Sequence, residues 1–332
     1  MDLTTVAPDE VVAHDGTTVH RHRGLEPDTT YRFEGFEATT LPRPHGELLA
    51  TFATINDVHF GELAAGLIDG AGEGFSVPPG TTPYPTFMNA DAVAEMVALD
   101  PLAVLVKGDL TTDGSADQLA EFEELYRGAF GDRLEFIRGN HESYHHVRVG
   151  PSYRSVKLPG LTAVLIDTSR DGHANGTLAA EQLERLEDEA ADSDVPLVVF
   201  GHHHIWLPDE DRRDEKFFGV LPEASESLQA LIARHPNIRG YFAGHTHRNR
   251  RRFVDSTGDV PYVEVASVKD FPGAWAEYRV HEGTLVQVLR RVSTPRALEW
   301  TERTRGMFGG VYPMYSFGEL EDRCFLVDLE GA

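Results

Sequence analysis

The chain has 332 residues, of which 54 are acidic and 30 are basic, so its formal net charge is −24. A surface of this sign repels nucleic acid and anionic lipid at long range, which argues against a nucleic-acid-binding or membrane-surface protein. The hydrophobic fraction of 41% is typical of a globular protein. The single cysteine, Cys324, excludes both an intrachain disulfide and a thiolate metal site.

The amino-terminal stretch MDLTTVAPDEVVAHDG has neither the basic nor the apolar segment of a secretory signal peptide. The sequence also has no run of about twenty apolar residues that could form a membrane span. We therefore expect a cytoplasmic protein.

The first fifty residues favour β structure, and TTYRFEGFEATTL is the clearest strand among them. An overlapping stretch, GLEPDTTYRF, is similar to the end of a fibronectin-type sandwich, although fifty residues are too few for a complete one. We expect residues 1–47 to form a short β segment in front of the main domain.

Five apolar runs of strand length follow, and each of them ends in polar residues. They are LLATFATIND, LAVLVKG, LEFIRG, PLVVFG and IRGYFAG. Stretches with apolar residues three or four positions apart lie between them and predict helices over 89–100, 115–130, 178–192 and 222–235. Asn89 is expected to cap the first helix. Strands alternating with helices predict an α/β fold whose polar residues lie at the carboxyl ends of the strands, where such sheets bind ligands.

After residue 247 the pattern changes to short alternating runs, RRFVDS, VPYVEVAS, WAEYRVHE and TLVQVLRRV, which indicate antiparallel strands in a second sheet. We place the main domain at residues 48–292. Two segments remain as candidates for selecting a substrate: a Gly- and Pro-rich loop over 61–85 and an aromatic tail over 293–332. The tail could form a cap, contact a second subunit in a homodimer, or complete the second sheet.

Seven residues of metal-ligand type stand at the ends of the predicted strands. They are Asp57, His59, Asp109, Asn140, His202, His245 and His247. Each has a structural explanation when taken alone, because a Gly-Asp pair is usually a turn and a lone histidine is usually a satisfied polar residue. Independent turns would have no reason to repeat this chemistry, so the set predicts one shared site.

Imidazole and carboxylate ligands without thiolate suit Mn, Fe or Zn better than Ca or Mg. Seven ligands exceed what one ion needs if it is to keep an open position, which predicts two divalent or trivalent ions that share a bridging carboxylate. Two divalent ions would bring four positive charges, and Asp57 with Asp109 would remove two of them. The site would then attract a small anionic phosphoester that the acidic surface otherwise repels.

The ordered blocks D-x-H, G-D, G-N-H-E, G-H and G-H-x-H, which span Asp57 to His247, together resemble the calcineurin-like metallophosphoesterase family. The resemblance implies a four-layer α-β-β-α sandwich of two mixed sheets. It also implies two groups of ligands that share Asp109. The first metal would be held by Asp57, His59, Asp109 and His247. The second would be held by Asp109, Asn140, His202 and His245.

By the same resemblance, His141 would be the catalytic residue that contacts the phosphoryl oxygen and assists the leaving group, with a metal-bound hydroxide as the nucleophile. The cyclic-nucleotide branch of the family usually reads G-N-H-D and G-H-H-P, whereas this chain has Glu142 and His204. We expect Glu142 to orient His141 through a hydrogen bond, and we count neither His203 nor His204 as a ligand.

The G-N-H-E block is also similar to purple acid phosphatases. Those enzymes carry a tyrosine three residues after the bridging aspartate, where this chain has Thr112, and they lack the histidine of D-x-H. The class III cyclic-nucleotide phosphodiesterase type is therefore the closer branch. The resemblance implies a dinuclear metal-dependent phosphodiesterase for cyclic nucleotides or other small phosphodiesters. The alternatives are a phosphomonoesterase acting on nucleotides or sugar phosphates, a nuclease, and a non-catalytic metal-binding scaffold.

Overall fold

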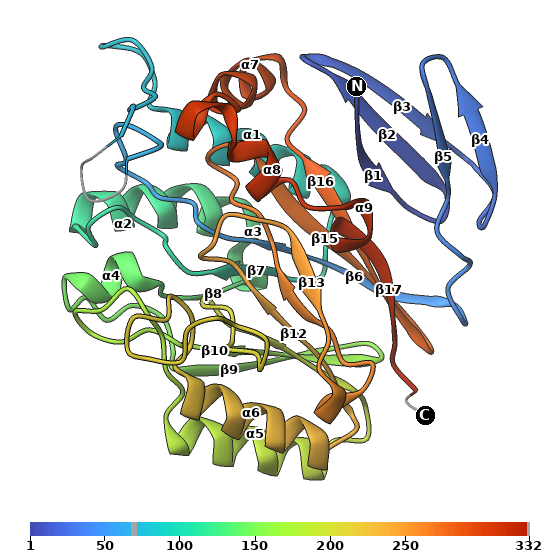
Figure 1. The fold of residues 1–332 in the computed structure, drawn as a ribbon, viewed down its shortest axis with the longest axis vertical. Helices are drawn as coiled ribbons and strands as arrows, with labels where there is room; N and C mark the ends of the chain where they lie inside the picture. The colour runs from blue at the N-terminus through green and yellow to red at the C-terminus, as the bar shows by residue number, and fades with distance from the viewer. Residues whose placement is uncertain (68–71, 331–332) are drawn as a thin grey trace.

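The computed structural model describes residues 1–67 and 72–330, and its main body is built on two six-stranded mixed sheets that pack face to face (Figure 1). The first sheet contains, in spatial order, β17 (Cys324–Asp328), β16 (Thr284–Arg291), β15 (Ala274–His281), β6 (Leu48–Ile55), β7 (Val104–Lys107) and β8 (Leu134–Ile137). The second contains β13 (Arg250–Arg252), β14 (Tyr262–Glu264), β12 (Ile238–Ala243), β11 (Leu197–Phe200), β10 (Leu161–Ile166) and β9 (Tyr153–Leu158).

Helices cover the outer faces of both sheets. The first sheet is covered by α1 (Tyr84–Leu99), by α2 (Ala116–Phe122), which continues through a π-helical turn (Glu123–Arg127) into α3 (Gly128–Phe130), and by α7 (Pro295–Thr304). The second is covered by α5 (Ala180–Asp192) and α6 (Pro222–Arg234), at the bottom of Figure 1. The remaining helical segments are α4 (Asn140–Tyr144), α8 (Tyr312–Ser316), α9 (Leu320–Arg323) and 3-10 turns at Gly131–Arg133, Asp255–Thr257 and Met307–Gly310. The predicted α-β-β-α sandwich is confirmed.

The four layers follow from alternation along the strands. In β7, Leu105 points into the core between the sheets, whereas Val104 and Val106 face the core beneath α1. In β11, Phe200 points between the sheets and Val199 faces α5 and α6. Because each of these strands is buried on both faces, its sequence is a continuous apolar run rather than an alternating one.

The structure corrects three predictions about the elements of the main body. The first predicted helix begins at Tyr84 rather than at Asn89, since Pro85 is accommodated in the first turn. Asn89 is buried inside this helix, where its Nδ2 donates to the backbone oxygen of Val58 at 2.9 Å, so it is not a cap. The four strands expected in one second sheet are divided between the two sheets, because β13 and β14 extend the sheet of β12 while β15 and β16 extend that of β6.

The amino-terminal segment forms an antiparallel sheet of β1 (Asp2–Val6), β2 (Glu10–Asp15) and β3 (Thr18–Arg23), followed by the hairpin of β4 (Thr30–Phe33) and β5 (Phe36–Thr39). The stretch predicted as one strand is therefore two. Phe33 pairs with Phe36 across a two-residue turn, and Gly35 in that turn has a φ of 88°, which favours glycine.

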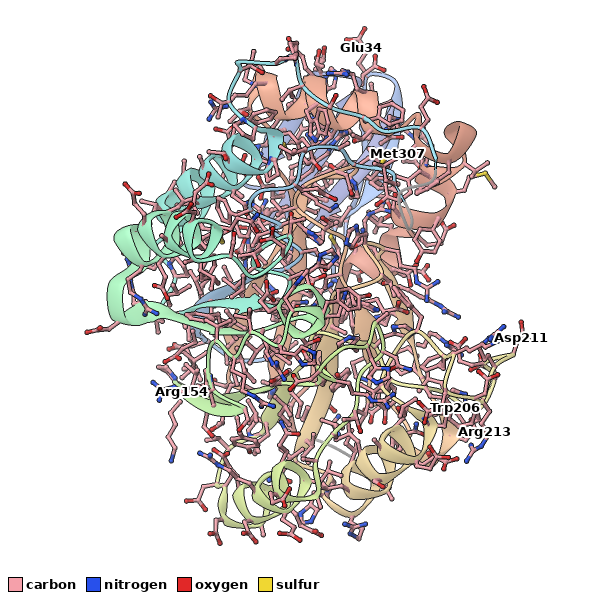
Figure 2. The ribbon with its side chains drawn as sticks, turned by 90° about the vertical axis from the view of Figure 1, so that its left-hand side faces the viewer. Glu34, Arg154, Trp206, Asp211, Arg213 and Met307 are labelled. Carbon is pink, nitrogen blue, oxygen red and sulfur yellow. The ribbon has the colours of Figure 1, made fainter. Side chains whose placement is uncertain are left out.

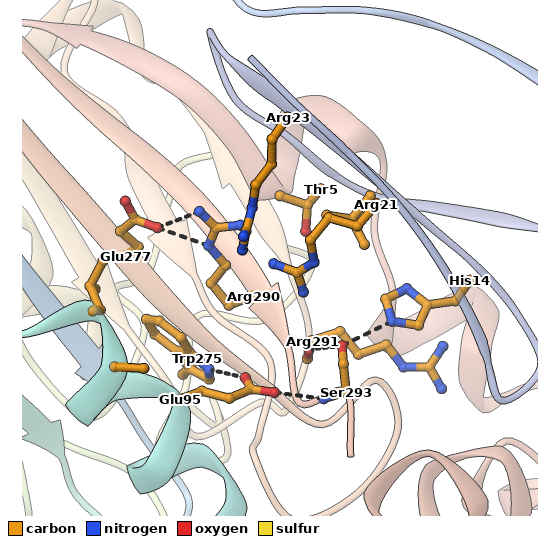
Figure 3. Close-up of a pocket in the computed structure, with 13 residues that line it drawn as sticks. Thr5, His14, Arg21, Arg23, Glu95, Trp275, Glu277, Arg290, Arg291 and Ser293 are labelled. Carbon is orange, nitrogen blue, oxygen red and sulfur yellow. Dashed lines mark hydrogen bonds and ion pairs between the residues drawn. The ribbon is translucent and has the colours of Figure 1, made fainter. Parts of the chain in front are cut away.

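A polar cavity of ≈340 Å³ lies where the three-stranded sheet meets α1, β15 and β16 (Figure 3). Three arginines that line it, Arg21, Arg23 and Arg290, bind acidic side chains. Buried Glu10 accepts hydrogen bonds from Arg21 at 3.0 Å, Arg23 at 3.1 Å and Arg290 at 2.5 Å. Arg290 also donates twice to Glu277, at 2.8 and 2.6 Å. These ion pairs attach the amino-terminal sheet to the main body.

The tail after residue 292 is integrated into the main body. Strand β17 pairs with β16 and completes the edge of the first sheet. Helix α7 packs on α1, where the rings of Tyr84 and Trp300 stack at 4.3 Å between centroids. Met307, labelled in Figure 2, is buried against Gly66 of the loop that follows β6. Across the described part of the chain, no helix has the length and apolar character needed to cross a membrane.

Candidate metal centre

The predicted ligands lie where the carboxyl ends of strands from both sheets meet. Strands β6, β7 and β8 run parallel in the first sheet, and β11 and β12 run parallel in the second. The residues that follow them are Asp57 and His59 after β6, Asp109 after β7, Asn140 after β8, His202 after β11, and His245 and His247 after β12. The sequence pattern suggests one sheet edge, whereas the structure builds the cluster from the facing edges of two sheets.

Asp109 is central to this cluster, and its two carboxylate oxygens face different histidines. Its Oδ1 lies 3.4 Å from Nε2 of His202, and its Oδ2 lies 3.5 Å from Nε2 of His59. On one side, Asp57 Oδ1 lies 3.5 Å from Nε2 of His247. On the other, Asn140 Oδ1 lies 3.0 Å from Nε2 of His202. The ligand atoms of Asp57, His59 and His247 fall within 4.8 Å of one another, as do those of Asp57, Asp109 and His202.

Three of the histidines have one ring nitrogen held outside the cluster. Nδ1 of His202 bonds the carbonyl oxygen of Lys107 at 2.7 Å, and Nε2 of His245 bonds that of Phe218 at 2.8 Å. Nδ1 of His247 lies 3.4 Å from the Asp270 carboxylate. Metal-ligating histidines are commonly oriented in this way, because the outer bond fixes which nitrogen carries the proton. The other nitrogen of each ring remains available as a ligand.

His59 provides a direct test of whether these residues fit a metal. Its side chain is 2% exposed, and neither ring nitrogen forms a hydrogen bond within residues 1–67 and 72–330. A buried polar nitrogen without a partner is costly. A metal ion beside Asp109 would satisfy it, so the donor set fits a metal centre.

His203 also lies near His202 and His245, but both of its ring nitrogens are engaged elsewhere. Nδ1 bonds the hydroxyl of Thr168 at 2.8 Å, and Nε2 bonds the backbone oxygen of Ala174 at 3.2 Å. Although its ring lies close to those of His202 and His245, a metal bound to either nitrogen would have to displace the hydrogen bond that this nitrogen makes. These contacts support its exclusion from the ligand set.

Five of the seven candidate ligands have a left-handed backbone. Their φ angles are 54° for Asp57, 48° for His59, 50° for Asp109, 67° for His245 and 54° for His247. Residues other than glycine rarely adopt such angles, and strained backbone of this kind gathers at functional sites. The sharp turns aim side chains of consecutive strand ends at one point.

The buried carboxylates of the cluster stabilise the protonated form of two of its histidines. Burial acts to lower the pKa of His247, but the carboxylates of Asp57 and Asp270 raise it to about 10. Burial likewise opposes the charge of His202, whose pKa is raised to about 9 by Asp109 and Asp57. The buried carboxylates therefore favour positive charge in their midst, which divalent cations would supply.

His141 lies at the open side of the cluster. Its side chain is 29% exposed, and its Nε2 lies 4.0 Å from Oδ2 of Asp109. Nδ1 bonds the backbone oxygen of Thr112 at 2.8 Å, and the backbone nitrogen of His141 donates to Oδ1 of Asp109 at 2.9 Å. Because Nδ1 donates to a carbonyl, Nε2 is the nitrogen that can face a molecule bound at the centre.

The expected hydrogen bond from Glu142 to His141 is wrong. The Glu142 carboxylate turns into the protein and accepts from the backbone nitrogen and hydroxyl of Thr111, at 2.8 and 2.6 Å, and from the backbone nitrogen of Gly139 at 2.8 Å. These bonds join the turn after β7 to the start of α4. The longer side chain of glutamate therefore supports the loops that carry Asp109 and Asn140 instead of His141.

Two residues of the centre escaped the sequence analysis. Asn56 is fully buried, and its Nδ2 donates to Oδ2 of Asp57 at 2.5 Å. Its position next to the D-x-H block was a signal that could have identified it. Asp270, beside His247, follows β14 without any recognisable motif and is brought to the site by the fold alone.

A family model described as calcineurin-like phosphoesterase matches residues 50–249. A glycerophosphodiester phosphodiesterase from Enterobacter lignolyticus is 28% identical over 175 residues, covering 48% of this chain and 61% of the relative. A cAMP/cGMP dual specificity phosphodiesterase from Mycobacterium tuberculosis is 26% identical over 167 residues, covering 45% of this chain and 49% of the relative. The chain thus matches 61% of the length of the first relative and 49% of the length of the second, less than two thirds of either.

Among solved structures, a dimetal phosphatase from Danio rerio matches with a TM-score of 0.59 at 16% identity, covering 74% of this chain and 97% of that one. A purple acid phosphatase from yellow lupin matches with a TM-score of 0.50 at 15% identity, covering 83% of this chain and 60% of that one. At these identities the likeness concerns the fold.

Proposed function

The chain belongs to the calcineurin-like phosphoesterase family, and from this premise we propose that it is a dinuclear metal-dependent phosphodiesterase acting on cyclic nucleotides or other small phosphodiesters. The observation that carries the proposal is the buried His59, whose ring nitrogens form no hydrogen bond among the described residues and whose Nε2 lies beside Asp109 within a cluster of further candidate ligands. The diester preference is supported by the two relatives named as phosphodiesterases.

In this proposal one metal would be held by Asp57, His59, Asp109 and His247. The other would be held by Asp109, Asn140, His202 and His245. Bound metal ions of this kind neutralise a phosphoryl group and activate water for attack on it. The opposed oxygens of Asp109 suit it to serve both sites, since each faces a histidine of a different group.

His141 is the proposed acid that assists the leaving group. The bond from Nδ1 to Thr112 keeps the ring in one orientation, and the exposure of the side chain gives Nε2 access to a substrate. A protonated Nε2 could donate to the leaving oxygen while the Thr112 carbonyl stabilises the charged ring from the other side. The backbone bond to Asp109 links the position of this acid to that of the bridging ligand.

The proposal is tested by metal analysis and a substrate panel on the same preparation. We expect close to two transition-metal ions per chain and faster hydrolysis of bis-p-nitrophenyl phosphate than of p-nitrophenyl phosphate. We further expect hydrolysis of 3′,5′-cyclic nucleotides or glycerophosphodiesters. Asp109→Asn is the matched control for contaminating activity, because the change retains the shape of the side chain and removes its charge.

Faster hydrolysis of monoesters than of diesters would show that the protein is a phosphomonoesterase and not a phosphodiesterase. Two bound metals without turnover of any phosphoester would indicate a scaffold. A protein that binds no transition metal would overturn the proposal as a whole.

A further inference from the structure

The segment between β14 and β15 carries a buried carboxylate that contacts the candidate ligand His247. Asp270 is 2% exposed, and its Oδ2 lies 3.4 Å from Nδ1 of His247. The opposite nitrogen of that ring, Nε2, faces Asp57 at 3.5 Å. Asp270 therefore lies behind the histidine, on the side away from the centre.

The other oxygen of Asp270 is held by the carboxyl-terminal tail. The hydroxyl of Tyr312 donates to Oδ1 of Asp270 at 2.8 Å, and Tyr312 is 4% exposed at the start of α8. The end of the same helix is bonded close to His247 as well, since the backbone nitrogen of Asn249 donates to the backbone oxygen of Ser316 at 3.0 Å. Helix α8 thus contacts both Asp270 and the segment that carries His247.

A simpler role for Asp270 would be to neutralise the buried Lys269. The distances argue against it, because Lys269 Nζ lies 2.5 Å from Oε2 of Glu62 and 3.9 Å from Asp270. Lys269 therefore has a nearer partner of its own. The Asp270 carboxylate instead contacts Tyr312 through one oxygen, at 2.8 Å, and His247 through the other, at 3.4 Å.

A carboxylate behind a ligating imidazole keeps the proton on the outer nitrogen, fixes the orientation of the ring, and makes the inner nitrogen a better donor. A hydroxyl that donates to the second oxygen would in turn fix the carboxylate plane. Resting on the proposed function, in which His247 binds a metal, we propose that Asp270 is a positioning residue for His247 and that Tyr312 acts through Asp270. The tail is then part of the support of the metal centre.

The experiment measures metal affinity rather than turnover. Metal-free protein is prepared with a chelator and titrated with Mn²⁺ or Zn²⁺. We expect Asp270→Ala to lower the affinity for one of the two ions by about 10- to 100-fold, the usual effect of losing such an outer partner. Asp270→Asn should recover part of this loss, because the amide still offers an oxygen to His247. Tyr312→Phe should lower the affinity for the same ion by less than Asp270→Ala does, because Asp270 itself remains.

Tyr315→Phe is the matched control, since Tyr315 lies on the same helix and is 45% exposed. It should bind both ions as the wild type does. In the Asp270→Ala background, Tyr312→Phe should have no further effect on affinity, because the residue through which it acts is absent. Thermal unfolding of each metal-free variant, followed by circular dichroism, identifies a variant that has lost its fold.

Wild-type affinity for both ions in Asp270→Ala would overturn the inference while leaving the proposed function intact. An undiminished effect of Tyr312→Phe in the Asp270→Ala background would overturn the role of Tyr312. If Asp270→Ala does not fold, Asp270→Asn and Tyr312→Phe decide by themselves, and wild-type affinity in both overturns the inference. A wild-type protein that binds no metal would instead overturn the proposed function and this inference together.

Discussion

The metal centre and the cavity beneath the amino-terminal sheet are both buried groups of charged side chains, yet they differ in how their polar atoms are satisfied. Beside the cavity, Glu10 is matched by Arg21, Arg23 and Arg290. In the cavity wall, Glu277 is matched by Arg290 (Figure 3). In the centre, His59 has two buried nitrogens without a hydrogen bond among the described residues.

The two regions also differ in backbone conformation. The residues that build the cavity walls lie mostly on regular strands, whereas five of the candidate ligands have positive φ angles. Strain and unsatisfied atoms persist only where something else compensates for them. The ion pairs of Glu10 and Glu277 are closed, although one buried atom of the cavity lining, Nη1 of Arg291, also has no hydrogen bond among the described residues. The positive φ angles and the clustered ligand-type side chains therefore distinguish the centre from the cavity, in line with the proposed binding role of the centre and a structural role for the cavity.

Asp109→Ala should have the largest effect on metal binding and activity. Because Asp109 has one oxygen facing each group of ligands, we expect the variant to lose both metals and, with them, hydrolysis of every substrate. Inductively coupled plasma mass spectrometry and the substrate panel measure the two losses. Wild-type metal content in this variant would contradict the assignment of Asp109 as the bridge.

His141→Ala should separate chemistry from metal binding at the same centre. We expect the metals to remain and turnover to fall by about 10²- to 10⁴-fold, the range for a group that transfers a proton. The loss should be smaller for substrates with good leaving groups, which need less protonation. Loss of metal, or an equal loss of turnover for all leaving groups, would indicate a ligand or structural role for His141.

Glu10→Gln should lower the stability of the protein and leave the metal centre unchanged. Removing this charge leaves the buried donors of Arg290 poorly matched, so the free energy of unfolding should fall by about 1–3 kcal/mol. Metal content and turnover per folded molecule should not change. Glu37→Gln is the matched control, because the Arg32–Glu37 pair is exposed and should contribute under about 1 kcal/mol. Reduced metal content in Glu10→Gln would contradict the structural role of the cavity.

His14, which lines the cavity, should have an effect only at acidic pH, visible in the pH dependence of stability. Burial, with a further contribution from Arg291, lowers its pKa to about 3. The unfolded chain therefore takes up a proton near pH 6.5 that the folded protein does not, and stability is lost as the pH falls through this range. At pH 5 this amounts to about 2 kcal/mol relative to neutral pH.

His14→Gln removes that titration, so the stability lost between pH 7.5 and pH 5 should be smaller in the variant than in the wild type. Chemical unfolding at the two pH values measures the difference. His173→Gln, at an exposed position, should behave as the wild type does. An equal loss of stability in His14→Gln and the wild type would show that His14 is not held neutral.

Local sequence determined the fold class and the candidate site to a large extent. The five apolar runs are strands β6, β7, β8, β11 and β12, because a strand buried on both faces must be continuously apolar. The polar blocks that end them were visible for the same reason, since a polar residue directly after such a run has to lie at the edge of the sheet. The seven candidate ligands could be named from this pattern.

Tertiary structure alone decided how these pieces combine. Alternation in a strand does not specify its neighbour, so the division of β13 to β16 between two sheets depended on long-range pairing. Glu142 could reach either His141 or the turn after β7, and the donors of Thr111 and Gly139 settled its direction. Asp270 lies beside His247 through the path of the chain between β14 and β15, and Tyr312 reaches Asp270 because the tail folds back onto the main body. No local pattern encodes contacts made by residues so far apart along the chain.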